Sequence, residues 1–381
     1  MKKMLMIASV PSMIGQFNMN NIQILINLGF EVEVACDWSD RSVWTDEKVN
    51  DLKEKLSSLN VICHQIDYSR SPFNIGCHIK SYRQTLKLLR ENNYEFVHCH
   101  TPIASAVTRL ACKKTNTKCI YTAHGFHFYK GAPIKNWIIF YPIEKWLSKY
   151  TDVLITINME DYNRAKERFK MKKIYRVPGV GINYNKFYEC VVNRDEYRKK
   201  LNIYPNDFVI LSVGELCDRK NHITIMKSVK KLDDITVKYL VVGKGSEQEY
   251  LQNYINREEL NSQIQLLGFR TDIPELCKAS DIFAFPSKRE GLGLAAIEAM
   301  ASGIPIITSD INGINDYSKN YITGFKCNPN DISSFANYIK ILRDDMSLRN
   351  KMIKNNLEIA KKYDLKEVDK IMMEIYNTIL W

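Results

Sequence analysis

The run "REGLGLAAIEAMASGIPII" (residues 289–307) spaces two glutamates in a way that suits ligand binding. Glu290 precedes two glycines, and Glu298 lies eight residues later among small and apolar residues. Gly291 and Gly293 leave the backbone bare where a helix is expected to begin, and the N–H groups of a helix N-terminus attract anions. Carboxylates on both sides of an anion site predict a ligand with hydroxyls on both sides of a phosphate, such as a nucleotide sugar. The alternative is a solvated loop residue followed by a salt-bridged helix residue.

A second feature suited to anions is "VGELCDRKNH" (213–222), which follows an apolar strand-like run. Its Arg219 and Lys220 are adjacent cations at the carboxyl end of that strand. Two such cations suit a diphosphate without a metal ion, because they neutralise the charge directly. A solvated basic turn is the alternative interpretation.

Histidines follow two strand-like runs of the first half. "YTAHGFHFYKG" (121–131) ends a strand with His124, which could bond a sugar hydroxyl or a phosphate oxygen, or serve only the core. "VHCH" (97–100) places two histidines on one strand face, but no second cluster with zinc spacing accompanies them. We therefore expect no metal site.

Strand-like and helix-like runs alternate in two consecutive series, which predicts an α/β protein with two doubly wound Rossmann-like domains facing a central cleft. Apolar runs of the first series are expected to form strands at 4–10, 31–36, 96–100, 118–123 and 153–157. Those of the second series are 208–214, 238–243, 264–268, 282–287 and 305–309. The expected domains are 1–185 and 186–364, followed by a C-terminal helix, 365–381, that packs back on the first domain.

Glycines at strand ends distinguish the kinds of nucleotide site. The loop after the first strand, "PSMIGQFN", has the single glycine Gly15 rather than G-x-G-x-x-G, so a dinucleotide cofactor is poorly supported. In the second half, Gly243 and Gly245 follow a strand and precede a helix, where the backbone can approach a phosphate or a base. A plain tight turn explains the same pair.

The basic excess belongs to the first half of the chain. Residues 1–185 carry 26 Lys/Arg and 16 Asp/Glu, whereas residues 186–381 carry 28 and 27, within a total net charge of +11. A predicted helix has a basic stripe, and 129–150 mixes lysines with aromatic residues, as membrane-interface segments do. The stripe consists of Lys80, Arg83, Lys87 and Arg90. We expect contact with an anionic membrane surface, although an aromatic core helix with solvated lysines remains open; no nucleic-acid motif is present.

Ten scattered cysteines without a C-x-x-C pair indicate free thiols and a cytoplasmic protein. No run of about 18 apolar residues predicts a membrane-spanning helix. The N-terminal "MKKMLMIASV" (1–10) reads as a first buried strand rather than a signal peptide. The expected location is therefore the cytoplasm, peripheral to the inner face of the cell membrane.

Taken together, these motifs resemble retaining glycosyltransferases of family 4, which have the GT-B fold, and most of all the bacterial enzymes that build capsular or extracellular polysaccharide. The Glu, seven residues, Glu spacing followed by "AMASGIP" is the most specific feature. The resemblance implies that Glu290 holds hydroxyls of the donor sugar and Glu298 those of the ribose. Arg219 and Lys220 would neutralise the departing diphosphate, and His124 would contact the donor sugar. These positions, with Glu290, are the expected catalytic group.

Backbone and small residues complete the donor site that the resemblance implies. Gly15 would let the first loop approach the diphosphate, Gly243 would face the donor, and Gly268 and Phe269 would lie near the base. The remaining donor contacts would be the backbone of Gly291, Leu292 and Gly293. One position departs from the family pattern, because Glu215 stands where an Arg often follows the "VG" glycine. The diphosphate then depends more on the other two cations, or on a cation from elsewhere.

The expected reaction is metal-independent and cofactor-free transfer of a hexose or N-acetylhexosamine from a nucleotide-diphosphate sugar, with UDP as the expected nucleotide. The acceptor would be a lipid-diphosphate-linked saccharide in capsule or exopolysaccharide synthesis. Fixed cations and a helix N-terminus would stabilise the negative charge that develops on the diphosphate. Two alternatives stay open: a nucleotide-sugar epimerase of the same architecture, and a non-catalytic, membrane-associated partner protein.

Overall fold

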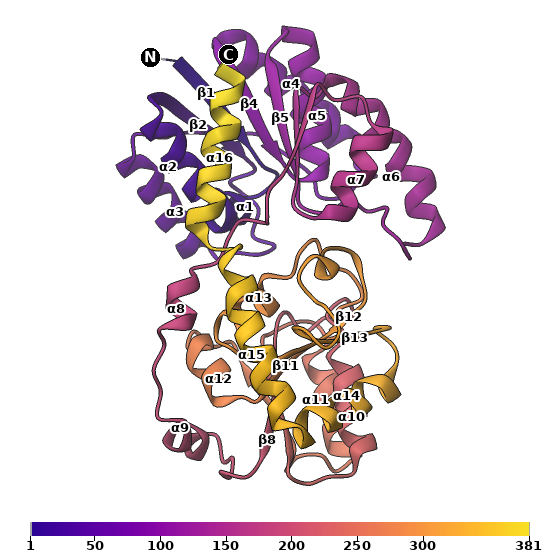
Figure 1. Ribbon diagram of the computed structural model, residues 1–381. Helices are drawn as coiled ribbons and strands as arrows, with labels where there is room; N and C mark the ends of the chain where they lie inside the picture. The colour runs from indigo at the N-terminus through magenta and orange to yellow at the C-terminus, as the bar shows by residue number, and fades with distance from the viewer. Residues whose placement is uncertain (1, 381) are drawn as a thin grey trace. The chain divides into compact units, whose positions relative to one another are not determined.

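The computed structural model describes residues 2–380 and divides the chain into two compact units (Figure 1). The first runs to Val180 and takes up the chain again from Val368, and the second comprises Gly181–Glu367. The division falls between residues 180 and 181, slightly before the boundary expected at 185. Each unit is a parallel sheet with helices packed on it, which is the arrangement expected from the two strand–helix series.

The sheet of the first unit has seven parallel strands in the order β3-β2-β1-β4-β5-β6-β7. The strands are β1 (Lys2–Ile7), β2 (Phe30–Cys36), β3 (Ile62–Gln65), β4 (Tyr94–His100), β5 (Lys118–Ala123), β6 (Val153–Thr156) and β7 (Lys173–Arg176). The helices are α1 (Pro11–Phe17), α2 (Met19–Asn27), α3 (Asp46–Ser58), α4 (Ile75–Glu91), α5 (Pro102–Thr115), α6 (Ile134–Leu147) and α7 (Met159–Arg168). The N-terminal apolar run thus forms a strand.

Both faces of this sheet are covered, and strand β1 shows how. Met4 and Met6 belong to one core with residues of α1, α2 and α3, whereas Leu5 and Ile7 belong to the other with residues of α4, α5 and α7. Alternate side chains of a strand point to opposite faces, so a strand covered on both sides must be apolar throughout. The uninterrupted run "MLMI" therefore follows from burial on both faces.

Helix α16 (Leu365–Leu380) covers part of the first sheet (Figure 1). Its residues Val368, Met372, Ile375 and Tyr376 recur every three or four positions, which places them on one helix face. All four are buried in the core that contains Met4. The last part of the chain is thus held to the first unit by an apolar stripe.

The second unit has six parallel strands in the order β10-β9-β8-β11-β12-β13. The strands are β8 (Phe208–Val213), β9 (Val237–Val242), β10 (Ile264–Gly268), β11 (Ile282–Phe285), β12 (Ile306–Ser309) and β13 (Gly324–Cys327). The helices are α8 (Tyr184–Tyr188), α9 (Arg194–Lys200), α10 (His222–Leu232), α11 (Gln248–Arg257), α12 (Ile273–Ala279), α13 (Leu294–Ala301), α14 (Ile332–Asp344) and α15 (Met346–Lys361).

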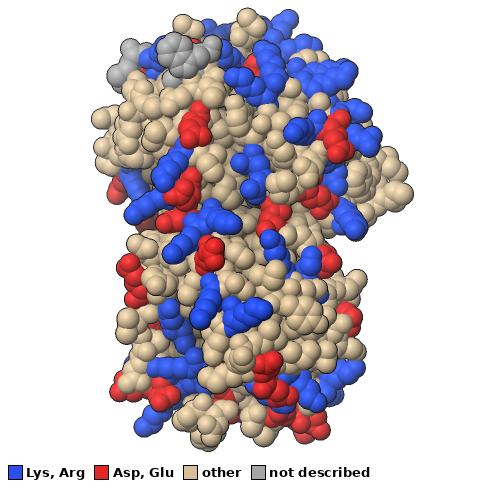
Figure 2. Space-filling view, in the orientation of Figure 1, with Lys and Arg blue, Asp and Glu red and all other residues tan. Residues whose placement is uncertain are grey.

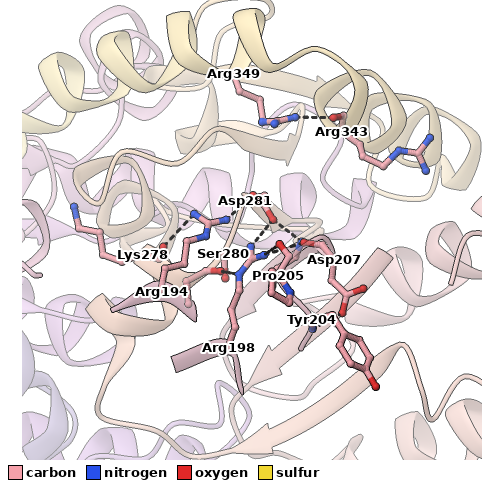
Figure 3. Close-up of polar contacts among 12 residues, drawn as sticks. Arg194, Arg198, Tyr204, Pro205, Asp207, Lys278, Ser280, Asp281, Arg343 and Arg349 are labelled. Carbon is pink, nitrogen blue, oxygen red and sulfur yellow. Dashed lines mark hydrogen bonds and ion pairs between the residues drawn. The ribbon is translucent and has the colours of Figure 1, made fainter. Parts of the chain in front are cut away.

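A buried ion pair ties α9 to the start of strand β11 (Figure 3). The Arg198 side chain is 3% exposed and donates to Asp281 Oδ2 at 2.8 Å and to the carbonyl oxygens of Ala279 and Asp207. Arg194 reaches the other oxygen of Asp281 at 2.6 Å. Asp281 also accepts the backbone N–H of Val209 at 2.8 Å, so this carboxylate joins α9, β8 and β11. The two central strands of the sheet are therefore fixed in register by one charged group.

Across residues 2–380, every helix is too short or too polar to cross a bilayer.

Candidate donor site and the histidine cluster of the first unit

The motifs predicted to bind the donor meet where the strand order of the second sheet changes direction. In the strand order, β8 and β11 are neighbours, and the strands that follow each of them are added on opposite sides. A crevice opens at the carboxyl ends of such strands, and ligands of doubly wound folds bind there. Arg219 and Lys220 follow β8, and Glu290 follows β11, so the predicted residues flank this reversal point.

The three charged side chains are in direct contact. Lys220 Nζ lies 2.7 Å from Glu290 Oε1, and Arg219 Nη1 lies 3.1 Å from the same oxygen. Glu290 is buried at 8% exposure, so its carboxylate needs these partners. Lys220 Nζ also lies 4.8 Å from the centre of the Phe285 ring, which fixes the ammonium against the end of β11. The cluster consists of two cations and one carboxylate. Lys220 and Glu290 are largely buried, and Arg219 is the most exposed of the three.

The backbone after Glu290 is closely packed, which explains the glycine at position 293. Gly293 has φ +86°, and a Cβ there would lie 2.5 Å from Phe285 Cε1. The Tyr317 hydroxyl donates to the Gly293 carbonyl at 3.3 Å. Leu292 is 3% exposed, so a ligand would meet its backbone rather than its side chain. A Cβ at Gly313 would lie 1.9 Å from Gly291 O, so the loop after β12 supports this turn from behind.

The loop after β9 is held against the loop after β8. Gly243 has φ +147°, and a Cβ there would lie 1.9 Å from Gly214 O. Gly245 meets Leu216 O in the same way at 2.3 Å. Gly268, with φ +66°, accepts the N–H of Gly243 at 2.8 Å, and Phe269 beside it is 66% exposed. The predicted donor-binding residues Gly243 and Gly268 are thus at the carboxyl edge of the sheet. Gly243 allows backbone to approach backbone, whereas a Cβ at Gly268 would meet nothing within 4 Å.

Glu298 lies on α13, apart from the charged cluster. Among residues 2–380, which the structure describes, nothing forms a hydrogen bond or an ion pair with its carboxylate. Burial raises the pKa of this carboxyl group to about 7, and Lys186 of α8 opposes that shift. A half-buried carboxylate of this kind gains from a ligand that donates hydroxyl hydrogens. The ribose role of Glu298 stays a prediction.

Sequence reasoning missed Asn221, the residue that fixes the basic turn. Its φ is +59°, and its side-chain amide donates to Pro286 O at 3.0 Å and to Pro329 O at 2.7 Å. The turn that carries Lys220 is therefore anchored to two neighbouring loops. The departure at Glu215 leaves a carboxylate 4.0 Å from Arg219 Nη2, with 60% of its side chain exposed. The only sequence signal for the role of Asn221 was that Asn tolerates a left-handed backbone conformation.

In the first unit, the histidines form a buried chain of contacts. His98 bonds the Tyr376 hydroxyl through Nδ1 and Thr122 Oγ1 through Nε2, both at 2.8 Å. His100 Nδ1 lies 3.1 Å from His124 Nε2. Burial lowers the pKa of His98 to about 3 and that of His124 to about 4, so both rings are neutral at pH 7. Because the contact with His100 uses Nε2, a ligand would meet Nδ1 of His124.

The loop that carries His124 is anchored by Asp161 of α7. Asp161 Oδ2 accepts the backbone N–H of Phe126 at 2.9 Å and the Asn158 amide at 3.0 Å.

The prediction for Gly15 was wrong in one respect, because this residue lies inside α1 rather than in a loop. A Cβ at Gly15 would lie 2.2 Å from the Trp44 ring, so its small size serves the packing of α1.

Comparisons with known proteins identify the family. Residues 17–180 match the model described as Glycosyltransferase Family 4, and residues 193–358 match Glycosyl transferases group 1. A putative glycosyltransferase of Bacillus subtilis strain 168, EpsD, is 31% identical over 100% of this chain and 97% of its own. The chain belongs to glycosyltransferase family 4. A Staphylococcus aureus relative, named as the capsular polysaccharide biosynthesis glycosyltransferase CapM, is 26% identical over 87% of this chain and 89% of its own.

Two further comparisons concern the relatives of this family 4 glycosyltransferase. An Escherichia coli enzyme named UDP-Gal:α-D-GlcNAc-diphosphoundecaprenol α-1,3-galactosyltransferase is 29% identical over 92% of this chain and 91% of its own. The crystal structure of Anabaena HepE in complex with UDP and glucose superposes with a TM-score of 0.78. It is 18% identical and covers 99% of this chain and 100% of its own, so it shows that the glycosyltransferase has the GT-B fold.

Proposed function

We propose that the protein is a retaining glycosyltransferase that moves a hexose or N-acetylhexosamine from a UDP-sugar to a lipid-diphosphate-linked saccharide in capsule or exopolysaccharide synthesis. The observation that carries the proposal is the contact of Glu290 with Lys220 and Arg219 at the reversal point of the second sheet. The two cations can exchange the carboxylate for a diphosphate, and Glu290 can then accept hydrogen bonds from sugar hydroxyls. Glu298 on α13 would accept the ribose hydroxyls.

The cations would act on the bond that breaks. When the anomeric carbon–oxygen bond breaks, its electron pair goes to the diphosphate, and the sugar gains oxocarbenium character. Lys220 and Arg219 would stabilise that negative charge without a metal ion or cofactor. The acceptor hydroxyl would attack the same face of the sugar, and its proton would pass to the leaving phosphate oxygen. This front-side course retains the anomeric configuration and needs no protein nucleophile.

The nature of the substrates is inferred from the relatives. The name of the E. coli enzyme specifies a UDP-sugar donor and a GlcNAc-diphosphoundecaprenol acceptor, and the HepE structure contains UDP. The same two substrate classes suit this chain, because its donor motifs are those of the family. His124 would contact the donor sugar through its neutral ring, in the role that the family resemblance gives it.

An anionic membrane surface is the proposed partner of the first unit. Helix α6 exposes Ile134 at 78%, Ile138 at 68% and Trp146 at 46%. In Figure 2 the projecting edge of this unit, where Figure 1 places α6, is largely free of charge, with Lys and Arg side chains beside it. Apolar side chains flanked by cations favour an interfacial position. The protein would thus bind the inner face of the cell membrane from the cytoplasm.

A donor panel read by released nucleoside diphosphate tests the proposal. We expect transfer from one or more UDP-hexoses or UDP-N-acetylhexosamines to a GlcNAc-diphosphoundecaprenol acceptor, and a loss of at least about 100-fold in kcat for Lys220→Ala. Lys288→Ala is the matched control, because Lys288 lies in the neighbouring loop and pairs with Asp218 instead. Activity of Lys220→Ala within a few-fold of the wild type would contradict the phosphate role.

Further measurements separate the transferase from the epimerase and from the non-catalytic partner protein. Conversion of the sugar in the absence of acceptor would indicate an epimerase. Failure of every nucleotide to raise the melting temperature would indicate a non-catalytic partner, since a ligand that binds the native state stabilises it. Flotation with vesicles containing anionic phospholipid tests the membrane contact, and absence of binding at low salt would contradict it.

A further inference from the structure

The first unit contains an apolar cavity that the donor chemistry does not use. It has a volume of about 430 Å³ and lies between helices α4, α5 and α6 and the segment Gly125–Phe128, which follows β5. A volume in the range of about 300–1,000 Å³ is typical of ligand pockets rather than of packing defects. The cavity therefore has room for a substantial part of a ligand.

The walls of the cavity are almost entirely hydrocarbon. Ile103, Val107 and Leu110 of α5 face Ile79 of α4 and Phe140 of α6 across it. Its one carboxylate, Glu144, is already satisfied by Arg109, whose guanidinium reaches both carboxylate oxygens at 2.9 and 3.1 Å. A sugar or a nucleotide would lose its hydrogen bonds to water here and find few replacements, whereas an apolar chain would lose none.

The mouth of the cavity is also apolar. Ile75 and Ile79 of α4 are 68% and 49% exposed, and Ile143 of α6 is 46% exposed. All three line the cavity, so the apolar surface continues from the solvent-facing rim to the interior. Contiguous exposed apolar surface of this kind marks an interaction site.

Cations lie directly beside this apolar site. An adjoining depression of about 480 Å³ shares Tyr82 and Leu110 with the cavity and adds Lys113, Lys114 and Trp146. The combination suits a site at the surface of an anionic membrane, where hydrocarbon enters the cavity and the lysines face the negative headgroups of the surrounding lipids. The opposite end of the cavity, at Gly125 and His127, lies at the carboxyl edge of the sheet, next in sequence to His124.

We infer that the cavity holds the isoprenoid chain of a polyprenyl-diphosphate-linked acceptor. The inference rests on the proposed function, because it takes the acceptor to be lipid-linked, and it adds the place where the lipid is recognised. The diphosphate end of the chain lies towards Gly125 and His127, since the carboxyl edge of the sheet is where chemistry occurs in such folds. The protein thereby selects an acceptor by its lipid as well as by its saccharide.

Binding of geranylgeranyl diphosphate, measured by titration calorimetry, tests the cavity without any transfer reaction. We expect it to bind the wild type at least about tenfold more tightly than inorganic pyrophosphate, because burying its hydrocarbon is favourable. Ala106 lines the cavity, and the larger side chain of Ala106→Phe should fill it. This variant should therefore bind geranylgeranyl diphosphate no more tightly than pyrophosphate. Equal affinity of the wild type for the two ligands would overturn the inference.

A pair of isoleucines on α6 provides a matched comparison. Ile143 and Ile139 are both 46% exposed, but of the two only Ile143 lines the cavity. Ile143→Glu should weaken geranylgeranyl diphosphate binding at least about tenfold, whereas Ile139→Glu should leave it within about twofold. Equal effects of the two variants would contradict a cavity site, as would a change of oligomeric state in Ile143→Glu, which would indicate an interface between copies.

Transfer assays in detergent separate this inference from the proposed function. Acceptors with the same saccharide diphosphate on a long polyprenyl or a short alkyl chain should differ in KM, and Ala106→Phe should raise KM for the long chain alone. If neither acceptor is glycosylated but chain-dependent binding persists, the proposed function fails and the cavity assignment stands. If transfer occurs with no dependence on chain length, the cavity assignment fails and the proposed function stands.

Discussion

Lys220 Nζ lies 2.7 Å from Glu290 Oε1, which joins the residue that follows β8 to the residue that follows β11. The same oxygen accepts from Arg219 at 3.1 Å, so one carboxylate keeps two cations together before any ligand is present. A diphosphate that enters must compete with this carboxylate. The pairing therefore positions the cations in advance, and it weakens their attraction for phosphate at the same time.

Replacing Glu290 with Gln should separate these two effects. The amide keeps the shape of the side chain but no longer neutralises the cations, so UDP should bind up to about tenfold more tightly. Sugar transfer should nevertheless fall by at least about 100-fold, because the donor sugar loses its carboxylate partner. Calorimetry with UDP and initial rates with the UDP-sugar measure the two effects separately.

The control is Glu215→Gln in the neighbouring turn. The Glu215 carboxylate is 4.0 Å from Arg219 and largely exposed, so its removal should change UDP affinity and turnover by less than about threefold. Weaker UDP binding combined with normal turnover in Glu290→Gln would contradict the assigned competition.

Two glycines with nearly equal φ angles test the packing behind the donor loop. Gly293 has φ +86° and Gly29 has φ +84°, but a Cβ at Gly29 would meet nothing within 4 Å, whereas one at Gly293 would meet Phe285 at 2.5 Å. Gly29→Ala should reduce the free energy of unfolding by about 1 kcal/mol through backbone strain alone. Gly293→Ala should cost about 1–3 kcal/mol more and should weaken UDP-sugar binding.

Urea unfolding of both variants, with UDP-sugar titration of each, measures the difference. The donor-site effect should be confined to Gly293→Ala, because Phe285 contacts Lys220 through its ring. Equal losses of stability in the two variants would mean that the loop can shift to accept a methyl group.

Every strand that lies within a sheet was predicted from sequence, and so was one edge strand, β10, whose run "IQLLG" is mostly apolar. The run "KCIYTA" gave β5 with its bounds, since the strand is buried on both faces after Lys118 and is therefore mostly apolar. The edge strands β3 and β7 were missed because their residues are mostly exposed or half-buried, and their sequences lack an apolar run. Edge strand β13 was also missed, since its four residues, "GFKC", include a lysine and a glycine.

Some parts of the candidate donor site could also be predicted from sequence, and others could not. The turn 288–293 and the helix after it could be predicted from the spacing of residues, because glycines and small residues determine backbone conformation locally. The partners that fix the site are distant in sequence: Asn221 contacts Pro329 O, and His100 contacts His124. Such pairings depend on strand order, which a single sequence does not specify. The depth at which Glu298 is buried has the same origin.

The buried Arg198–Asp281 pair predicts a large stability effect away from the ligand site. Arg198→Met should reduce the free energy of unfolding by about 3–5 kcal/mol, because it leaves Asp281 with one cation fewer and removes donors from buried carbonyl groups. Arg257→Ala is the control, since Arg257 is 70% exposed in its pair with Glu258 and its removal should cost less than about 1 kcal/mol. Urea denaturation followed by circular dichroism measures both, and a small effect for Arg198→Met would indicate that water replaces its contacts.

The pKa of Glu298 makes stability and donor binding respond oppositely to pH. Burial raises this pKa to about 7 from its ordinary value of 4.5, so the folded protein favours the protonated form. This stabilising contribution is complete below pH 4.5 and is lost as the pH rises through about 7. Glu298→Gln, which stays neutral, should therefore have a higher melting temperature than the wild type at pH 8 and a similar one at pH 5.

Donor binding should have the opposite dependence, because ribose hydroxyls donate hydrogen bonds to the ionised carboxylate. The affinity for UDP-glucose should rise between pH 6 and 8 and level off above, with a slope approaching tenfold per pH unit below 7. UDP-glucose is the suitable probe, since its diphosphate is esterified at both ends and does not titrate in this range. Glu298→Gln should bind more weakly at pH 8 and show no such slope. A wild-type affinity that is constant from pH 6 to 8 would show that Glu298 does not hold the ribose as a carboxylate.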